Sequence, residues 1–479
     1  MKKLIIDVEN TIFQINEKYK DFSPYRETNK LVSIGWKWLD EDEVHYLFMY
    51  HTELKEIDFA ALKKFQVDLN NADTVIAHNA KYDISWLEEA GFDLSHLKIE
   101  DTMIREYIMA RGRTDISFRL ADTCKRYKVS EKGELFEKYP DTQISEMPIA
   151  EVEDYGRADV QACAELYLAQ EERLNQDSYK GLRKTVDMTC EFSRVLIDME
   201  RAGVKIDEKA LKKVEEEFTD EAEKLKFDLN MLVKKYMGDT VVNLDSPQQL
   251  SEVIYSRAIN KGAEDRWKTV FNIGKDERGK NLRRPKMSTK EYVDSVKQLT
   301  HMIMKTVASS CNDCGGVGAQ QKIKKSGVPW KRKTKCPVCK GVGIIYTEIN
   351  EVAGFHMRPK NIHWTTQGGF STNSTFLQEL VEQAENQNKP EAKLFIEKIM
   401  RLSSISSYLS NFVGGISAFK QANGILHTNY NQCVTATGRL SSTKPNLQNQ
   451  PREATFPIRK CFVSRFDGGK LIEIDFAQL

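Results

Sequence analysis

The 479-residue sequence has no run of about 18 apolar residues, the minimum for a membrane-spanning helix. Its short apolar start is interrupted by Asp7, which argues against a signal peptide. Cysteine is scarce and odd in number, at nine, which excludes a disulfide scaffold. Neither sign of charge dominates: 71 Lys and Arg oppose 70 Asp and Glu, which excludes a uniformly basic coat for nucleic acid. We expect a soluble intracellular protein of roughly two to four domains.

A short apolar segment near the start of the chain ends in two acids. Leu4–Val8 is typical of a buried strand, and side chains alternate between the two faces of a strand. Asp7 and Glu9 therefore project to the same face, where two carboxylates repel each other unless a cation lies between them. Alone, this D-x-E pattern also fits a strand that runs into a solvated turn.

Two later segments place further acids at the starts of helices. A second apolar strand ends at Asn79, and the helix expected after it carries Asp83 on the same face as Asn79. A long helix is predicted over Glu153–Leu168, in which Tyr155 and Asp159 have the same spacing. Each pair alone would be ordinary on a solvated helix.

In this order, the D-x-E, H-N-x-K-Y-D and Y-G-x-x-D patterns resemble the DEDDy 3′–5′ exonuclease family, over residues 1 to about 170. Thr102, in a D-T-M segment, fits the family, whereas Asn10 departs from the Thr that is common after D-x-E. The resemblance implies an α/β RNase H-like domain, with a mixed sheet and flanking helices. It also implies two Mg²⁺ or Mn²⁺ ions ~3.5–4 Å apart, in a cage of oxygen ligands.

The resemblance also assigns roles to individual residues. Asp7, Glu9 and Asp159 would hold the ion that activates the nucleophile. Asp7 would bridge to the second ion, which Asp83 would help to fix. Tyr155 would orient the attacking water, and Asn79, in the second motif, would support the site.

The middle of the chain resembles a second family. A helical pattern from about Asp187 leads into M-E-R-A-G-V-K-I-D, and a charged amphipathic helix is expected over Glu208–Lys235. In the segment that follows, Ser246 and Pro247 are a favourable N-cap and first helical residue. Together these features resemble the opening and the thumb of a family A DNA polymerase of the DNA polymerase I type.

Thr435–Pro451 carries the strongest polymerase motif, T-x-T-G-R-L-S-S followed by P-N-L-Q-N-x-P. Its Gly, Ser, Pro and Asn content also fits a polar loop, but the ordered agreement favours the motif. Gln450 departs from the apolar residue usual in the family. The resemblance implies contact with a primer–template duplex through this motif and the I-R-x-x-F segment after it. The implied DNA contacts are Arg439, Asn446, Gln448, Asn449 and Arg459.

Lys470–Leu479 resembles motif A of the polymerases, an apolar strand in which Asp475 would be a catalytic aspartate and Mg²⁺ ligand. The fingers helix and the later His-Asp-Glu motif are not among these residues, so that the metal site is incomplete and we expect no synthesis by this chain alone. The explanations are a split gene with a second polypeptide carrying the fingers and the rest of the palm, a truncated reading frame, or loss of synthesis. The first is favoured because insertions often interrupt essential sites.

The segment between the two polymerase motifs is unusually long and basic. Residues 261–340 hold 20 Lys and Arg against 7 Asp and Glu, a net charge of +13, which leaves −12 for the rest of the chain. Two C-x-x-C-x-G-x-G knuckles, with Cys311, Cys314, Cys336 and Cys339, predict one structural Zn²⁺ ion. They resemble the DnaJ-type zinc module only as paired knuckles. Between them lie Trp330 and the basic residues Lys322, Lys324, Lys325, Lys331, Arg332, Lys333 and Lys335, a run that favours contact with nucleic acid or a replication partner but also fits a solvated loop.

We therefore predict an exonuclease domain (1–180), the first thumb helices (181–260), a basic zinc insertion (261–362) and the remaining thumb with a partial α+β palm (363–479). The favoured function is proofreading within a replicative polymerase that acts on single-stranded 3′ ends and primer–template duplexes. Because the first motif begins at Asp7, we expect no 5′-nuclease domain ahead of it, a layout that resembles phage polymerases. The implied location is the cytoplasm of a bacterial or phage-infected cell. The alternatives are a stand-alone DEDD exonuclease with a zinc and basic module that binds RNA or DNA, and a non-catalytic DNA-binding fragment.

Overall fold

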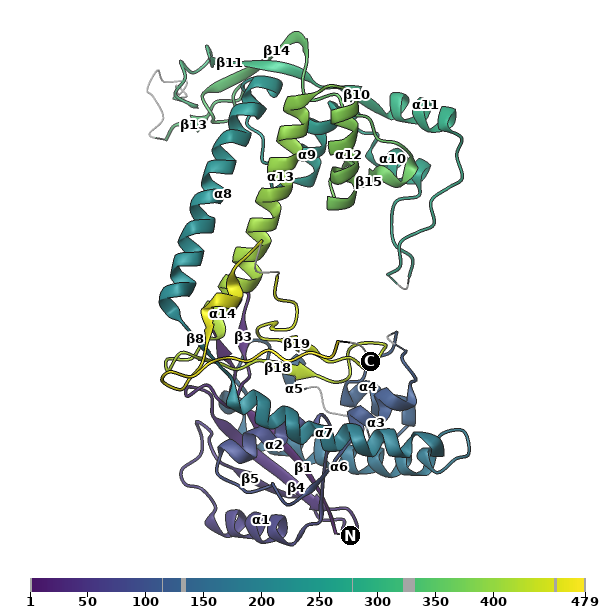
Figure 1. Ribbon diagram of the computed structural model, residues 1–479, viewed down its shortest axis with the longest axis vertical. Coiled ribbons are helices and arrows are strands. Elements are labelled where there is room, and N and C mark those ends of the chain that lie inside the picture. Colours follow the sequence, from purple (N-terminus) through teal and green to yellow (C-terminus); the bar gives the residue numbers. More distant parts are fainter. Residues whose placement is uncertain are drawn as a thin grey trace, which may run out of the picture. The chain divides into compact units, whose positions relative to one another are not determined.

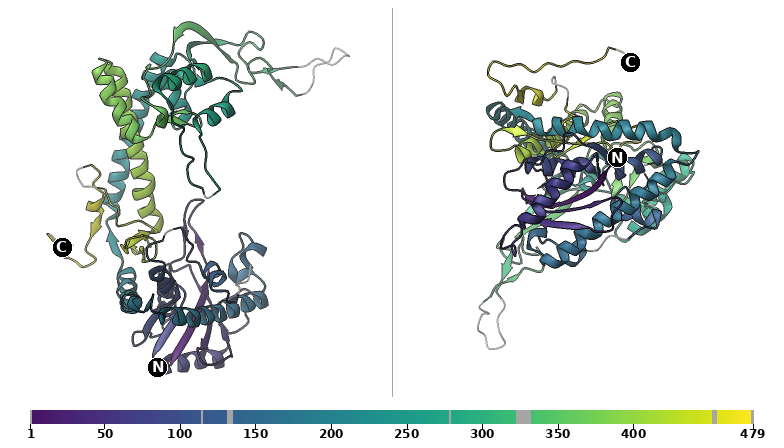
Figure 2. Two further views of the ribbon diagram at one scale, coloured as in Figure 1. Left: turned by 90° about the vertical axis from the view of Figure 1, so that its right-hand side faces the viewer. Right: turned by 90° about the horizontal axis from the view of Figure 1, so that it is seen from below.

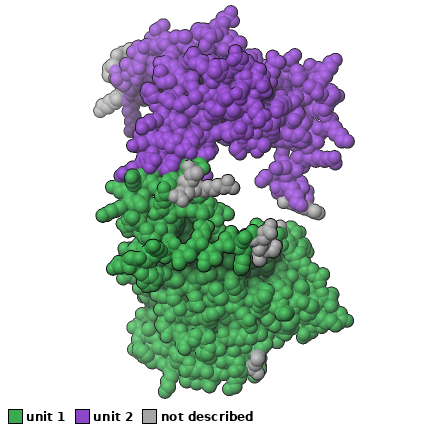
Figure 3. All heavy atoms as spheres, viewed as in Figure 1, with its two compact units in different colours: residues 1–215, 408–479 green, residues 216–407 purple. Residues whose placement is uncertain are grey.

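A computed structural model describes residues 2–113, 115–130, 135–277, 279–321, 332–451 and 455–477. Contacts divide the chain into two compact units: unit 1 contains residues 1–215 and 408–479, and unit 2 contains residues 216–407 (Figure 3). These bounds cut across the four segments expected from the sequence, a division that stays a prediction. Within the described ranges, no helix combines the length and the apolar character needed to cross a membrane.

A five-stranded mixed sheet forms the centre of the N-terminal part of unit 1 (Figures 1 and 2). The strand order is β5-β4-β1-β6-β7, in which β1 pairs antiparallel with β4 and parallel with β6. The strands are β1 (Lys3–Asn10), β4 (Leu31–Trp38), β5 (His45–Phe48), β6 (Thr74–Ala77) and β7 (Lys98–Asp101). The helices of this part are α1 (Phe59–Asn71), α2 (Ala80–Glu89), α3 (Thr102–Met109), α4 (Leu120–Tyr127), α5 (Leu135–Lys138), α6 (Ile149–Leu174) and α7 (Arg183–Ala202). The mixed sheet with flanking helices agrees with the expected fold class.

The alternation of side chains along β1 separates two packed faces. Leu4, Ile6 and Val8 belong to the core that also includes residues of α1 and α2. Ile5 belongs to a second cluster, to which α6 contributes Val160. Because Asp7 and Glu9 follow Ile5 at intervals of two, they lie on the face of the sheet that α6 covers.

The C-terminal part of unit 1 adds small sheets to this core. β8 (Val204–Ile206) is the middle strand between β17 (Ile425–Leu426) and β20 (Phe462–Val463), and it pairs antiparallel with both. β18 (Asn429–Asn431) and β19 (Ser441–Thr443) form an antiparallel pair, in which Tyr430 lies opposite Ser442. The expected polymerase motif at Thr435–Pro451 thus includes one strand of a hairpin.

Unit 2 is mainly helical, with a long antiparallel ribbon. Its helices include α9 (Pro247–Tyr255), α10 (Glu264–Phe271), α11 (Thr289–Leu299) and α12 (Ser374–Asn386). Two helices cross the unit boundary: α8 (Glu208–Met237), and α13 (Pro390–Tyr408) at its last residue. The strands include β9 (Arg257–Ile259), β10 (Thr300–Met302), β11 (Met304–Ser310) and β14 (Ile344–Val352), of which β11 and β14 pair antiparallel. The start of α9 is as expected, because the Ser246 side chain accepts a hydrogen bond from Gln249 N as an N-cap.

The expected motif A strand is wrong for this structure. Residues 470–476 form no strand, and the side chains of Ile472 and Ile474 are 82% and 89% exposed. An apolar strand is stable only when a neighbouring strand satisfies its backbone groups and a packed layer covers its side chains. Among the residues that the structure describes, no strand pairs with this segment.

Gly156, in the Y-G-x-x-D motif on α6, lies where α6 approaches the sheet closely. A Cβ atom on Gly156 would lie 2.4 Å from the Tyr46 hydroxyl oxygen. We predict that Gly156→Ala destabilises the protein by about 1–3 kcal/mol, because the extra methyl group overpacks this contact. Chemical denaturation monitored by circular dichroism would measure the effect.

Gly181→Ala is the matched control, because a Cβ atom there has no neighbour within 4 Å. This substitution should leave the free energy of unfolding unchanged or raise it by about 0.5–1 kcal/mol. Equal effects of the two substitutions would contradict the close approach of α6 to the sheet.

Candidate functional site

Three carboxylates predicted as metal ligands lie together in unit 1. Asp7 and Glu9 project from β1, and Asp159 projects from α6 onto the same face of the sheet. One oxygen of each carboxylate lies within 4.8 Å of the others. Asp159 is buried, whereas Asp7 and Glu9 are half-buried. Such a set of anionic oxygens fits a hard divalent cation, which prefers oxygen ligands.

The fourth predicted acid, Asp83, lies beside this cluster on the first turn of α2. Its Oδ1 atom accepts a hydrogen bond of 3.1 Å from Val8 N, between the two acids of β1. Burial raises the pKa of Asp83 well above its usual value, and the charge of Asp7 raises it further. A cation near the two carboxylates would favour the ionised form of both.

Tyr155 lies on α6 one turn before Asp159, and it is buried. Burial raises the pKa of its hydroxyl, as do the negative charges of Asp159 and Glu9. The hydroxyl therefore stays protonated at neutral pH and can donate a hydrogen bond.

Asp101, which sequence reasoning did not assign, fixes the position of α2. Its side chain caps α3 by accepting hydrogen bonds from Met103 N and Ile104 N. The same carboxylate accepts hydrogen bonds of 3.0 and 2.8 Å from the backbone of Asn79 and Ala80, at the start of α2. An Asp before Thr-Met is a recognisable N-cap signal. Its hydrogen bonds to the start of α2 could not be recognised from the sequence, because they join distant segments.

The structure also shows the positions of Asn79, in the second motif, and of Asn10, which departs from the family pattern. Asn79 has a left-handed backbone with φ of 71°, and its side chain makes no capping hydrogen bond. Asn10 is buried, and its Oδ1 accepts a hydrogen bond from the Tyr82 hydroxyl on α2. Asn10 therefore ties the end of β1 to the helix that carries Asp83.

A buried ion pair links α2 to the C-terminal part of unit 1. Lys81 Nζ donates hydrogen bonds of 2.6 and 2.8 Å to the two carboxylate oxygens of Glu200, at the end of α7. It also lies 2.7 Å from Asn429 Oδ1, and Tyr430 N donates to Glu200 Oε1 at 2.6 Å. Burial lowers the pKa of Lys81 and raises that of Glu200, while the attraction between them opposes both shifts. The pair thus anchors α2 to α7 and β18.

The predicted duplex-binding segment is held by its own polar side chains. Ser442 Oγ accepts hydrogen bonds from Leu447 N and Gln448 N. Asn446 Oδ1 accepts from Gln448 N at 3.1 Å and from Asn449 N at 3.0 Å. The side-chain oxygen of Asn446 therefore shapes the turn, which leaves its amide group as the donor for a ligand.

The other predicted DNA contacts lie at the surface. Arg439, Gln448 and Asn449 are exposed. Arg459 is half-exposed, and its guanidinium lies 3.9 Å from Glu473. Asp475 is exposed, and no carboxylate cluster among the described residues includes it.

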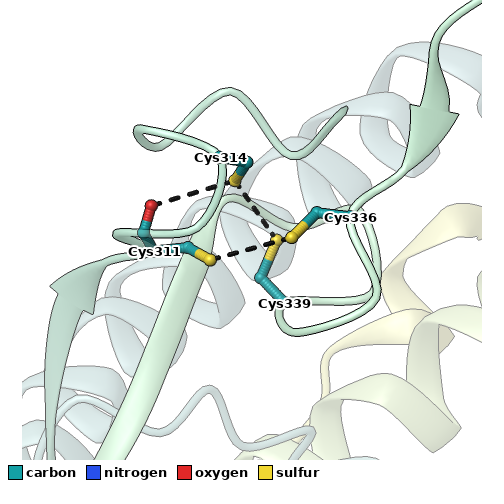
Figure 4. Close-up of side chains that lie close together, drawn as sticks. All are labelled: Cys311, Cys314, Cys336 and Cys339. Atoms are coloured by element: carbon teal, nitrogen blue, oxygen red, sulfur yellow. Dashed lines mark hydrogen bonds between the residues drawn. The ribbon is translucent and has the colours of Figure 1, made fainter. Parts of the chain in front are cut away.

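The four cysteines of the paired knuckles converge in unit 2 (Figure 4). The sulfur atoms of Cys311 and Cys336 are 3.8 Å apart, and those of Cys314 and Cys339 are 3.6 Å apart. A tetrahedral Zn²⁺ with Zn–S bonds of ~2.3 Å would place its sulfur ligands ~3.8 Å apart. The thiol groups therefore match the size of a Zn²⁺ site.

The two knuckles form a reciprocal pair. Cys311 N donates to Gly343 O at 2.9 Å, and Cys336 N donates to Gly318 O at 3.0 Å. Both glycines have a positive φ, and a Cβ atom on either would lie within 2.3 Å of a carbonyl oxygen of the other knuckle. Only glycine therefore allows the knuckles to approach this closely.

The same glycines also contact the sulfur atoms. Gly318 N donates to Cys314 Sγ and Gly343 N donates to Cys339 Sγ, both at 3.2 Å. Such N–H groups stabilise thiolates, which are the metal-binding form of cysteine.

Of the predicted basic run, Arg332, Lys333 and Lys335 are exposed. The remainder, Lys322, Lys324, Lys325, Trp330 and Lys331, lie outside the described residues.

We predict that Asp83→Asn stabilises the metal-free protein at neutral pH. The pKa of Asp83 is higher in the folded than in the unfolded protein. The free energy of unfolding therefore falls as the pH rises through the range between these two pKa values, because the unfolded protein loses this proton more readily. Asparagine keeps an oxygen acceptor for Val8 N without the charge. Thermal unfolding at pH 5 and pH 7.5, with and without Mg²⁺, would measure the effect. The gain should grow with pH, and Mg²⁺ should raise the Tm of the variant less than that of the wild type.

Glu89→Gln is the control for this prediction, because Glu89 is exposed on the same helix and also loses one negative charge. It should change neither the pH dependence nor the response to Mg²⁺. If both variants behaved alike, the effect would come from net charge and not from the cluster.

We also predict that the purified chain contains one zinc ion per molecule, measured by elemental analysis. Removal of zinc by a chelator should lower the Tm, because a small ribbon without a sizeable core depends on its metal. Cys314→Ser should lose the zinc. Val338→Ala, which changes an exposed side chain inside a knuckle, should retain it. Zinc-free wild-type protein after growth with zinc would contradict the site.

Two ranges of the chain match models of known protein families. Residues 20–175 match the family model described as 3′–5′ exonuclease. Residues 347–479 match the model of DNA polymerase family A. Asp7 and Glu9 lie before the first matched range, whereas Asp83, Tyr155 and Asp159 lie within it.

Curated relatives are DNA polymerases of bacteria and a bacteriophage. The DNA polymerase of Bacillus phage SP01 is 31% identical over 141 residues, which is 28% of this chain and 14% of the relative. The DNA polymerase I of Synechocystis sp. is 23% identical over 461 residues, which is 94% of this chain and 34% of the relative. The chain thus spans about a third or less of the length of these relatives.

A solved structure has a similar fold. It is the POL domain of Pol1 from M. smegmatis in complex with DNA primer-template and dNTP, with a TM-score of 0.53 and 19% sequence identity. The match covers 96% of this chain and 54% of that one. Together these matches confirm the resemblance of the chain to family A DNA polymerases that have a 3′–5′ exonuclease domain in the N-terminal part.

Proposed function

We propose that this chain removes nucleotides from the 3′ end of DNA, and that it does so as the proofreading part of a replicative DNA polymerase. The observation that carries the proposal is the convergence of Asp7, Glu9 and Asp159 within 4.8 Å, with Asp83 beside them. Phosphodiester hydrolysis requires an activated water and a stabilised leaving oxygen, and a cluster of carboxylates is suited to hold the ions for both.

The donor set fits two Mg²⁺ or Mn²⁺ ions, since its ligand atoms are all carboxylate oxygens. When bound, these ions supply the charge that activates water and stabilises the leaving oxygen. Asp7, Glu9 and Asp159 would hold one ion, and Asp7 with Asp83 would hold the other. The rigid supports of these acids are the paired strand β1 and the helices α2 and α6.

Tyr155 would orient the attacking water. Its raised pKa keeps the hydroxyl protonated, so that the O–H group can donate a hydrogen bond to an oxygen of the substrate or the water. This role needs a position next to the acids, which the negative charges of Asp159 and Glu9 acting on Tyr155 support.

For the C-terminal part of unit 1 we propose binding of a primer–template duplex, as part of a DNA-directed DNA polymerase, a nucleotidyltransferase. Arg439, Gln448 and Asn449 are exposed and free to meet phosphates or groove atoms, and Asn446 and Arg459 flank them. The need for a second polypeptide with the fingers and the rest of the palm stays a prediction. So does the lack of primer extension by this chain alone.

For the cysteine cluster we propose one structural Zn²⁺, held by Cys311, Cys314, Cys336 and Cys339. When bound, this ion would crosslink the two knuckles at the end of the β11–β14 ribbon. Its role would be to fold the insertion, since no open ligand position is needed for chemistry.

The exonuclease assay uses a 5′-labelled single-stranded DNA with Mg²⁺, and it resolves the products by length. The wild-type chain should shorten the strand from its 3′ end. Asp7→Ala should lower the rate by at least ~100-fold, the scale on which loss of one charge-stabilising group lowers kcat. Circular dichroism would show that the variant is folded.

Glu172→Gln is the control, because Glu172 is exposed on α6, the helix that carries Asp159. It should cleave at the wild-type rate. Full activity of Asp7→Ala would contradict the site. Cleavage of RNA in preference to DNA would favour the alternative, a stand-alone DEDD exonuclease with an RNA-binding module.

A further inference from the structure

Unit 2 contains a cleft of ≈ 870 Å³ that the proposed function does not use. It is lined by the ends of α9 and β10, by α11, by the segment after β14 and by the connection between α12 and α13. Figure 1 labels α9, α11 and α12, which all belong to unit 2. All of its lining residues belong to unit 2.

The cleft is lined by basic side chains without acidic ones. The basic residues that line it are Arg257, Lys297, His356, Arg358 and Lys389. No Asp or Glu occurs among the described residues that line it. The floor is apolar and aromatic, and it includes Tyr255, Val296 and Met357, which are buried. The cleft thus combines a positive rim with an apolar base.

Neutral groups, and no carboxylates, hold the inner cations in place. Arg257 Nε donates to Thr300 Oγ1 at 2.8 Å, and burial lowers the pKa of this guanidinium. Lys389 Nζ donates to two backbone carbonyl oxygens at 3.1 Å. Burial lowers the pKa of Lys389, and the charge of Arg358 lowers it further. Neither Arg257 nor Lys389 has a carboxylate partner, and a partly buried charge without one is costly unless a ligand supplies an anion.

Two exposed basic side chains and one buried hydroxyl of the cleft also lack hydrogen-bond partners among the described residues. The side chains of Lys297 and Arg358 make no hydrogen bond or ion pair with the described part of the chain, and both are exposed. Tyr292, which is 5% exposed, lines the same cleft, and its hydroxyl has no hydrogen-bond partner among the described residues. Buried hydroxyl groups are normally satisfied, so an orphaned one in a binding cleft is a further sign of a missing ligand.

We propose that this cleft binds the backbone phosphates of a single-stranded nucleic acid. Guanidinium and ammonium groups are the usual partners of phosphate oxygens. One side of the cleft, between Tyr292 and Met302, belongs to residues 261–340, which have a net charge of +13, and a field of this size attracts a long polyanion. An acidic peptide carries a similar charge, and it is an outcome of the test. The proposal uses none of the exonuclease residues and can fail independently of that function.

Lysine methylation in the presence of ligand tests this site directly. The 479-residue chain with Asp7→Ala, which keeps the strand intact, is methylated with and without a single-stranded oligodeoxynucleotide, and each lysine is quantified by mass spectrometry. Lys297 and Lys389 should be protected, whereas Lys261, Lys286 and Lys290 should not, because these three do not line the cleft. An oligonucleotide of the same sequence with an uncharged backbone should protect neither.

Charge variants provide the second measurement. Lys297→Gln with Arg358→Gln should abolish the protection of Lys389. It should also reduce the slope of log affinity against log salt concentration by about 1.4, at about 0.7 for each phosphate contact. Lys286→Gln with Lys290→Gln makes the same change in net charge outside the cleft and should leave the protection of Lys389 intact.

Three results would overturn the proposal. The first is equal protection by the uncharged oligonucleotide, which would mean that phosphates are not recognised. The second is protection by an oligoglutamate peptide but not by the oligonucleotide, which would assign the cleft to an acidic protein segment. The third is equal loss of protection in the two double variants, which would reduce the effect to the overall charge of the unit.

Discussion

Repulsion between carboxylates is the constraint on which the centre of unit 1 depends. Ligand atoms of Asp7, Glu9 and Asp159 lie within 4.8 Å of one another. Buried Asp83 accepts a hydrogen bond from the backbone of Val8, the residue between Asp7 and Glu9. Like charges in a poorly hydrated place raise the free energy of the folded state, because the interior screens them less than water does. The remainder of the domain supplies the rigidity that holds them there, through a β1 paired on both sides and through helices packed on both faces.

The insertion meets a related constraint in a different way. Its ribbon, β11 and β14, exposes most of its side chains and buries few apolar groups. The cluster at its end consists mainly of the cysteines themselves. In unit 1 the packed sheet and helices bring the carboxylates together, whereas in the insertion the cysteines themselves form most of the packed cluster. With the proposed ions bound, the carboxylate site would use them for chemistry, whereas the cysteine site would use its ion to hold the fold.

Patterns along the chain predicted what depends on local geometry. The interval of two between Asp7 and Glu9 placed both on one face of a strand, and Ser246 capped the helix expected after it. Contacts between distant segments were not predictable, because periodicity carries no information on partners. Asp101, which holds the starts of two helices, and the buried pair Lys81–Glu200 are examples. The expected strand around Asp475 also depended on neighbours that the described residues do not provide.

The Lys81–Glu200 pair has a consequence for how the exonuclease can be separated from the polymerase. The motifs end near residue 170, but a fragment cut at residue 180 would keep Lys81 and lose its carboxylate partner. The fragment would also lose Ile197 of α7, which belongs to the main hydrophobic core of the sheet. The cooperative folding unit therefore extends beyond the catalytic motifs to α7 and the β18 strand. In this chain, α2, which lies in the exonuclease match, and β18, which lies in the polymerase match, belong to one packed unit rather than to exchangeable modules.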